Sequence, residues 1–229
     1  MIKQLALGAA LFAGSISLSS AATIDFEDLT ESQPGDSFQT LVSGGVTFTA
    51  VRGGGSTAND ILGVFNTVCN GPGQPTCTGE NGDAGDDGDL SFPNGEYGLV
   101  LVINDQTPVA SFGTDDEENG GTIDVAFGTN VFVDDLVFLD LGDPASGSLE
   151  LFDDGVSQGI FNLVGLGNNT AATTSIGGVL ADQIVISFET SAALAEVNFT
   201  PVPVPAALPL MLSGLLGGLI FGRKKAKSA

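Results

Sequence analysis

The chemistry available to this chain comes almost entirely from carboxylates. The 229-residue sequence holds 28 Asp and Glu residues, two Cys and no His. Because His is the commonest general base and a frequent zinc ligand, its absence removes most nucleophilic triads and ordinary zinc sites. Two carboxylates about 5 to 10 Å apart can hydrolyse glycosides, but no spacing in the sequence singles out such a pair. We therefore predict that the chain is not an enzyme, with a carboxylate-based glycan hydrolase as the alternative.

The densest group of acidic residues is the segment ENGDAGDDGD at positions 80–89. Carboxylate oxygens on a Gly-rich loop suit calcium, and the candidate ligands are Asp83, Asp86, Asp87 and Asp89. The spacing matches neither the EF-hand loop nor the Gly-rich nonapeptide calcium repeats. A solvated acidic loop between strands therefore stays open as the alternative to a calcium site.

Cys69 and Cys77 are the only cysteines, and seven residues separate them. A metal site would require more Cys or His ligands, so we predict a disulfide, which fits an exported protein. On the chain-entropy model a loop this short stabilises the fold by about 2.5 kcal/mol.

The segment from Thr23 to Thr200 is strongly acidic, with 28 acidic residues against the single cation Arg52, a net charge of −27. Such a charge repels nucleic acid and anionic polymers unless cations intervene. Bound divalent cations would relieve the self-repulsion, although solubility outside the cell explains the composition equally well.

Short apolar runs separated by Gly, Asn, Asp and Pro clusters predict strands, and no segment has the 3.6-residue period of a long amphipathic helix. The clearest hairpin turn is Asp153-Asp154-Gly155. We expect an all-β fold, an antiparallel, jelly-roll-like β-sandwich of residues 23–200. The predicted strands are Thr23–Phe26, Val46–Val51, Ile61–Val68, Gly98–Ile103, Thr122–Phe127, Val131–Leu139, Ser148–Phe152, Gly159–Leu163, Gln183–Phe188 and Ala195–Thr200.

The first 22 residues have the pattern of a cleavable signal peptide. Lys3 precedes the apolar run Leu5–Ala13, and small residues lead up to Ala22. Signal peptidase would leave Thr23 as the first residue of the mature chain. The apolar run is too short to favour the alternative, a retained membrane helix.

The segment 201–229 combines a Pro motif, an apolar stretch and a basic end. A helix from Ala206 to Gly222 would measure roughly 25 Å, enough for a thin bilayer. The basic residues would stay in the cytoplasm and the preceding domain outside. The Pro motif is Val202, Pro203, Val204, Pro205 and Ala206, and the basic stop is Arg223, Lys224 and Lys225.

This tail resembles the PEP-CTERM sorting signal of Gram-negative bacteria, although Val204 stands where the family motif has Glu. The resemblance implies recognition by an exosortase and cleavage near the Pro motif. It further implies transient residence in the inner membrane and delivery to the outer surface or extracellular matrix, often alongside exopolysaccharide. An ordinary C-terminal anchor is the alternative.

The stretches TIDFEDL, GGVTFTAV and EVNFT resemble the ectodomains of exosortase substrates and, more loosely, jelly-roll carbohydrate-binding modules. In such modules acidic residues near both termini hold a structural calcium ion, which here would map onto Asp25, Glu27 and Glu196. The alternating Asp25 and Glu27 also suit the solvated face of an edge strand.

Together these patterns predict an exported, exosortase-sorted protein of the surface or extracellular matrix that binds polysaccharide, with calcium and without catalysis. Its partners would be signal peptidase, exosortase, exopolysaccharide and, transiently, the membrane, but not nucleic acid. A structural matrix or surface-coat protein without a discrete ligand site is the second alternative beside the hydrolase.

Overall fold

The computed structural model describes residues 19–30, 32, 38–53, 62–67, 90, 97–104, 120–141, 146–164, 167 and 170–203. One compact unit spans Ser20–Pro201. The predicted tail helix lies outside the described residues, and so does the predicted signal peptide apart from its last four residues. Within the part described, no helix is long and apolar enough to cross a membrane.

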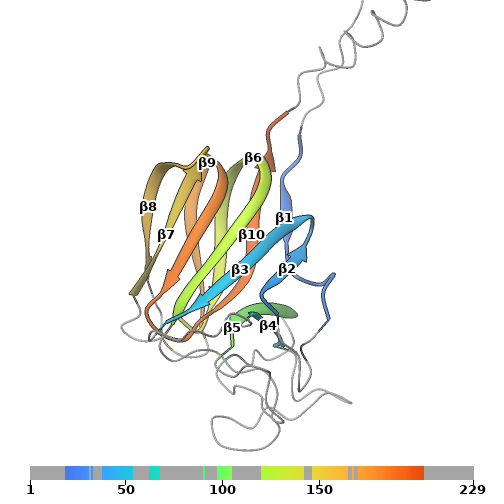
Figure 1. Ribbon diagram of the computed structural model, residues 1–229, viewed down its shortest axis with the longest axis vertical. Coiled ribbons are helices and arrows are strands. Elements are labelled where there is room, and N and C mark those ends of the chain that lie inside the picture. The colour runs from blue at the N-terminus through green and yellow to red at the C-terminus, as the bar shows by residue number, and fades with distance from the viewer. Residues whose placement is uncertain are drawn as a thin grey trace, which may run out of the picture. The chain divides into compact units, whose positions relative to one another are not determined.

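The ten regular elements that the structure describes in this unit are all antiparallel strands (Figure 1). This confirms the all-β, antiparallel prediction. They are β1 (Ala22–Ile24), β2 (Thr40–Ser43), β3 (Val46–Arg52), β4 (Leu62–Asn66), β5 (Leu99–Ile103), β6 (Gly121–Leu139), β7 (Ser146–Asp153), β8 (Val156–Val164), β9 (Ala171–Phe188) and β10 (Ala193–Pro201).

The ten strands form one continuous sheet because two long strands, β6 and β9, run through both of its halves. We call the first half the β8 sheet. In it, residues 121–126 of β6 pair with β3, and residues 183–188 of β9 pair with β7. Strand β8 pairs with the other side of β7. In the second half, the β10 sheet, residues 131–139 of β6 pair with β10. On its other side β10 pairs with β5 and β1, and β4 lies beyond β5.

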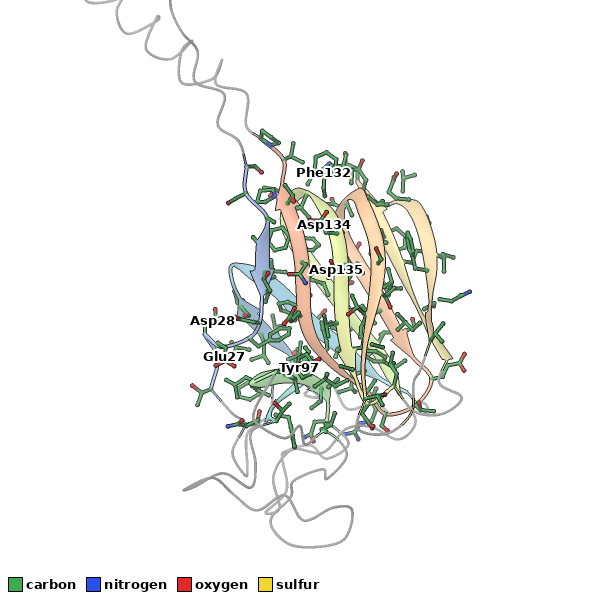
Figure 2. The ribbon with its side chains drawn as sticks, turned by 180° about the vertical axis from the view of Figure 1, so that it is seen from behind. Glu27, Asp28, Tyr97, Phe132, Asp134 and Asp135 are labelled. Atoms are coloured by element: carbon green, nitrogen blue, oxygen red, sulfur yellow. The ribbon has the colours of Figure 1, made fainter. Side chains whose placement is uncertain are left out.

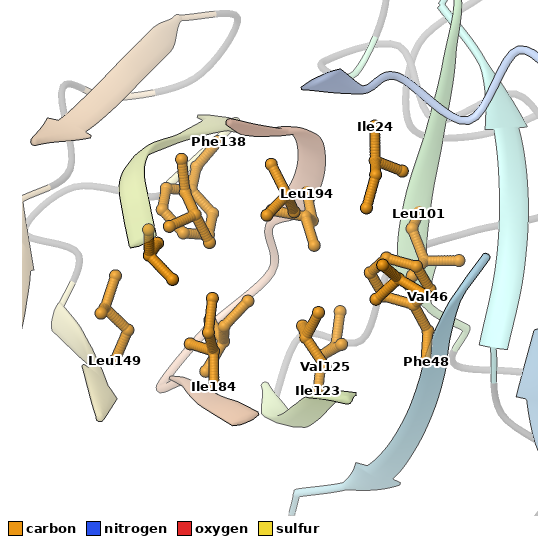
Figure 3. Packing of buried hydrophobic residues seen from close by; sticks show 14 of the residues in the cluster. Ile24, Val46, Phe48, Leu101, Ile123, Val125, Phe138, Leu149, Ile184 and Leu194 are labelled. Atoms are coloured by element: carbon orange, nitrogen blue, oxygen red, sulfur yellow. The ribbon is translucent and has the colours of Figure 1, made fainter. Parts of the chain in front are cut away.

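The two halves pack face to face around one apolar core. Phe138 of the β10 sheet meets Phe188 of the β8 sheet with ring centroids 5.8 Å apart and planes at 82°. Phe127 and Phe199 make a second ring contact at 5.2 Å. Figure 3 shows the same arrangement, with Phe138 and Leu194 on one side of the core and Ile184 on the other. Burial of these side chains is the main stabilising term of the fold.

A second, smaller apolar cluster lies on the outer face of the β10 sheet. Its members come from β4, β5, β6 and β10 together with Leu90, and Tyr97 packs against them. The buried residues are Phe65, Leu90, Val100, Val102, Val137, Leu139, Ala193 and Ala195.

The sequence prediction was wrong about three elements. Thr122–Phe127 and Val131–Leu139 are a single strand, since an irregularity between Ala126 and Val131 bends β6 without ending it. Strand β9 begins at Ala171, twelve residues before the predicted Gln183. The short strand β2 was not predicted.

Candidate functional site

A row of outward-facing polar side chains crosses the β10 sheet next to the second apolar cluster. Along β10, Val197 and Phe199 point into the core, so that Glu196, Asn198 and Thr200 face outward. Thr23 of β1 lies beside Asn198, and Asp135 of β6 lies on its other side. We call these residues, with Asp134, the polar strip: Thr23, Asp134, Asp135, Glu196, Asn198 and Thr200.

Asp134 and Asp135 are adjacent in the sequence, yet both reach the same face. A register shift between Val133 and Asp135 breaks the alternation of β6 at this point. As a result, Thr200 Oγ1 donates to Asp134 Oδ2 at 2.9 Å while Asn198 Nδ2 donates to Asp135 Oδ1 at 2.8 Å. The bulge therefore doubles the number of carboxylates that β6 supplies to the strip.

Asn198 is the centre of the hydrogen-bond network. Its Oδ1 accepts a hydrogen bond of 2.5 Å from Thr23 Oγ1. Its Nδ2 donates to Asp135 and also to Glu196 Oε2, at 3.3 Å. One neutral amide thus separates two carboxylates and links three strands.

No cation compensates the strip among the described residues. The only basic residue of the segment 23–200, Arg52, belongs to β3 in the β8 sheet, and its Nη2 donates to the carbonyl of Asn104. Each carboxylate of the strip accepts one hydrogen bond from the residues described. A carboxylate has about four acceptor positions, so the strip can accept further hydrogen bonds from a ligand.

Aromatic side chains border the strip at both ends. Phe132 pairs with Thr200 and is 36% exposed. Tyr97 packs on the second apolar cluster, which includes Val137 five residues further along β6. Figure 2 shows Phe132, Asp134 and Asp135 along one face, with Tyr97 beyond them. At a rise of about 3.3 Å per residue, Phe132 and Val137 are about 15 Å apart.

The three acidic residues that the sequence assigned to calcium do not come together. Glu196 belongs to the strip, Asp25 is exposed just after β1, and Glu27 Oε1 accepts a hydrogen bond of 2.8 Å from the N–H of Leu99 on β5. Among the residues that the structure describes, no three acidic side chains are placed to hold a metal ion. Asp25, Glu27 and Glu196 therefore do not fit a single calcium site here.

Glu27 instead ties the segment after β1 to the start of β5. Its carboxylate lies directly over Gly98, where an added Cβ would stand 1.8 Å from Oε1. Gly98 also has a φ of +57°, which favours glycine. The close approach explains why a residue without a side chain occupies this position.

Asp28 is a structural carboxylate that the sequence reasoning did not single out. Its two oxygens accept hydrogen bonds from Ser43 Oγ at 2.5 Å and from the N–H of Gly44 at 2.9 Å. These donors, Ser43 first, lower the pKa of Asp28. The carboxylate thereby fixes the turn between β2 and β3.

Asp124 is a carboxylate on the outer face of the β8 sheet. Partial burial raises its pKa, and a hydrogen bond of 2.5 Å from Gln183 Nε2 opposes that rise. It lies between Thr49 of β3 and Val185 of β9, away from the polar strip.

The remaining predicted residues lie outside the described part of the chain. They are the acidic loop residues Asp83, Asp86, Asp87 and Asp89, the cysteines Cys69 and Cys77, the motif residues Val204, Pro205 and Ala206, and the basic residues Arg223, Lys224 and Lys225. The calcium loop, the disulfide and the sorting tail stay predictions.

No protein-family model and no curated protein matches this chain. Among solved structures, it is similar to the family 32 carbohydrate-binding module from C. perfringens NanJ in complex with galactose. That match has 13% identity and a TM-score of 0.34, and it covers 51% of this chain and 87% of the other. The match to a His 62 mutant of the lectin binding domain of Lectinolysin, complexed with Lewis b, has 15% identity and a TM-score of 0.31. It covers 39% of this chain and 69% of the other.

Discoidin II of Dictyostelium discoideum gives 15% identity and a TM-score of 0.30, with 44% of this chain and 48% of the other covered. Similarities this low do not distinguish between functions. The polar strip is the feature of the molecule that bears on function.

Proposed function

We propose that this domain is a non-catalytic module that binds a hydroxyl-rich polysaccharide outside the cell through the polar strip. The observation that carries the proposal is the network around Asn198, which holds carboxylates, an amide and hydroxyls in register on one sheet face. Sugar hydroxyls donate and accept hydrogen bonds, and charge-assisted bonds to carboxylates are the stronger kind. The strip offers free acceptor positions of that kind.

The aromatic side chains Phe132 and Tyr97 at the two ends of the strip favour a sugar ligand over a peptide or an ion. The apolar face of a sugar ring packs on an aromatic ring, and Phe132 is exposed at one end of the strip. Both Phe132 and the carboxylates are carried by strands, which position side chains better than loops do. The distance of about 15 Å along β6 suits several consecutive sugar units rather than a single one.

Charge sets the class of polysaccharide. A domain with a net charge of −27 repels an anionic polymer, so the ligand is neutral, or calcium bridges it to the protein. For the bridging ion we propose the loop residues Asp83 to Asp89, since Asp25, Glu27 and Glu196 do not assemble a site. The export and sorting that the two chain ends imply would deliver the module to the surface or extracellular matrix, where such polymers accumulate.

Retention on the producer's exopolysaccharide tests the proposal. The full-length chain, solubilised in detergent, is passed over the immobilised polymer in calcium and then in EDTA. Saturable retention is expected, and its loss in EDTA would assign calcium to the complex. Release of shortened glycan during the run would instead favour the hydrolase.

Variants of the strip make the test specific. Asp135→Ala removes an acceptor, and Phe132→Ala removes the stacking surface; each is expected to weaken retention about tenfold or more, on the order of 1.5 kcal/mol. Glu150→Ala, which removes an outward carboxylate from β7 in the β8 sheet, is the matched control and should bind normally. Equal retention of all three variants would contradict the proposal.

A structural matrix protein is the second candidate function. It is favoured by strand β8, which pairs only with β7 among the described strands and leaves that edge of the β8 sheet open to association.

A further inference from the structure

Strand β8 is the open edge of the β8 sheet. Among the described strands it pairs only with β7, and it stands at the end of the strand order (Figure 1). An edge strand presents unpaired N–H and C=O groups to any other strand, and natural proteins block such edges with Lys, Pro, inward-pointing charges or bulges. The sequence of β8, VSQGIFNLV, has no Pro and no charged residue.

One protective device is present, but it covers only half of the strand. Leu151 pairs with Gly159 and Phe152 with Ser157, so that Gln158 is an extra residue that bulges near the turn. From Gly159 to Val164 the pairing with β7 is regular. This stretch of six residues is therefore extended, uncharged and open on one side.

The side chains of this stretch match themselves in an antiparallel arrangement. Ile160 and Val164 face outward and are 65% and 67% exposed, with the exposed Asn162 between them. If Asn162 lies opposite Asn162 of a second copy, Ile160 lies opposite Val164 of that copy. On the inner face, Phe161 then lies opposite Leu163, and both are part of the core packing. Apolar side chains meet apolar ones on both faces, and two amides meet on the axis.

We propose that β8 joins two copies of this chain edge to edge, with a two-fold axis at Asn162, so that the β8 sheets of both copies continue into one another. Such an interface is isologous and closes as a dimer.

The distribution of charge is compatible with this register. The acidic segments 23–200 of two copies, with a net charge of −27 each, repel one another, and β8 adds no charged residue to the contact. The acidic turn at Asp153 and Asp154 follows β7 at one end of the hairpin. With the axis at Asn162, the two turns lie at opposite ends of the paired strands, about 50 Å apart, well beyond the screening length of about 10 Å.

The contact is small, since one strand pair buries less than the roughly 800 Å² per partner of a standard interface. Association is therefore expected to be weak in dilute solution and to grow at the high density of a surface layer. Sedimentation equilibrium of the full-length chain in detergent should show dimers at about 0.1 to 1 mM, the range of weak association. A single mass of one copy across that range would overturn the proposal.

Cross-linking tests the register itself. Asn162→Cys should cross-link with itself through a short thiol-to-thiol linker. Ile160→Cys should cross-link with itself at least tenfold less, because its symmetry mate is offset by four residues, about 13 Å. Mixing Ile160→Cys with Val164→Cys should restore the product. The wild-type chain gives the background from Cys69 and Cys77, and Val42→Cys, on the short strand β2 with an exposure of 55%, is the matched control. Equal yields at positions 42, 160 and 162 would refute the register.

A charge variant separates the edge from general repulsion. Ile160→Lys places an ammonium opposite Glu150 of β7, which should preserve the hairpin. It also makes each copy less negative, so any loss of association must come from the edge. We expect Ile160→Lys to abolish the dimer and Val42→Lys to leave it unchanged. The reverse result, or equal association of both variants, would contradict the proposal.

Discussion

Replacing Asn198 by Asp tests the polar strip most directly. The hydroxyl of Thr23 can still donate to the new carboxylate, and the size of the side chain is unchanged. The second oxygen, however, takes the place of an amide that donates to Asp135 at 2.8 Å and to Glu196 at 3.3 Å. Two attractive contacts become two repulsive ones.

The expected cost is set by Coulomb's law. Two unit charges 2.8 Å apart, the separation between Asn198 and Asp135, repel by about 1.5 kcal/mol at a dielectric constant of 80 and by about 6 kcal/mol at 20. The strip is half-exposed, and a carboxyl group that takes up a proton no longer repels its neighbour. The repulsion energy therefore lies in the lower part of the range from about 1.5 to 6 kcal/mol. Together with the lost hydrogen bonds, we expect a decrease of about 3 kcal/mol in the free energy of unfolding at pH 7.

The loss should depend on pH in a defined direction. Repulsion raises the pKa of the new carboxyl group in the folded state above its unfolded value, so the folded state binds the proton more tightly. The difference between wild type and Asn198→Asp is therefore largest at pH 7 and shrinks as the pH falls through the raised pKa toward about 3.9. Once protonated, the introduced carboxyl group also regains a donor for Asp135.

Urea unfolding of both proteins at pH 7 and pH 4, followed by circular dichroism, measures this difference. Asn162→Asp, which adds the same charge to an exposed position of β8, is the control and should change stability by less than about 0.5 kcal/mol. If Asn198→Asp cost less than about 1 kcal/mol at both pH values, its amide would not lie between the two carboxylates, and the strip as described would be wrong.

Two further predictions concern the carboxylates outside the strip. Gly98→Ala should destabilise the domain by about 2 kcal/mol, because a Cβ would stand 1.8 Å from Glu27 Oε1 at a φ of +57°. In denaturant titrations, the additional change Glu27→Ala should recover about half of the lost stability. If it recovers none, the carboxylate is not the obstacle. Asp124→Asn should raise stability at pH 7 and leave it unchanged near pH 3. Burial raises the pKa of Asp124, so the stability linked to its proton is present below the unfolded-state pKa and is lost as the pH rises through the folded-state pKa. Thermal melts at pH 7 and pH 3 check this, and a loss of stability at pH 7 would contradict it.

The sequence predicted the all-β fold and most of its strands, because short apolar runs bounded by turn residues are local information. It could not predict that β6 continues through Gly128, since Phe-Gly-Thr-Asn has the composition of a turn. The continuity of β6 depends on its pairing with β9 on both sides of this segment, at residues 121–126 and 131–139. Such pairing is a property of the assembled sheet.

The candidate site was harder to predict than the fold. Asp134 joins the strip only through the register shift of β6, which no local pattern announces. Glu27 accepts a hydrogen bond from the N–H of Leu99, 72 residues away in the sequence. Both outcomes depend on which strands meet, so residue type alone could not predict these hydrogen bonds.

The last strand that the structure describes occupies an interior place in the sheet, and this has a consequence for the order of folding. Strand β10 lies between β6 on one side and β5 and β1 on the other, and Thr23 pairs with Asn198, 175 residues later in the sequence. The core therefore cannot close until the final strand has been synthesised. Contacts over such long sequence separations also form slowly. Folding of the domain can therefore finish only when its C-terminal strand is available to pair.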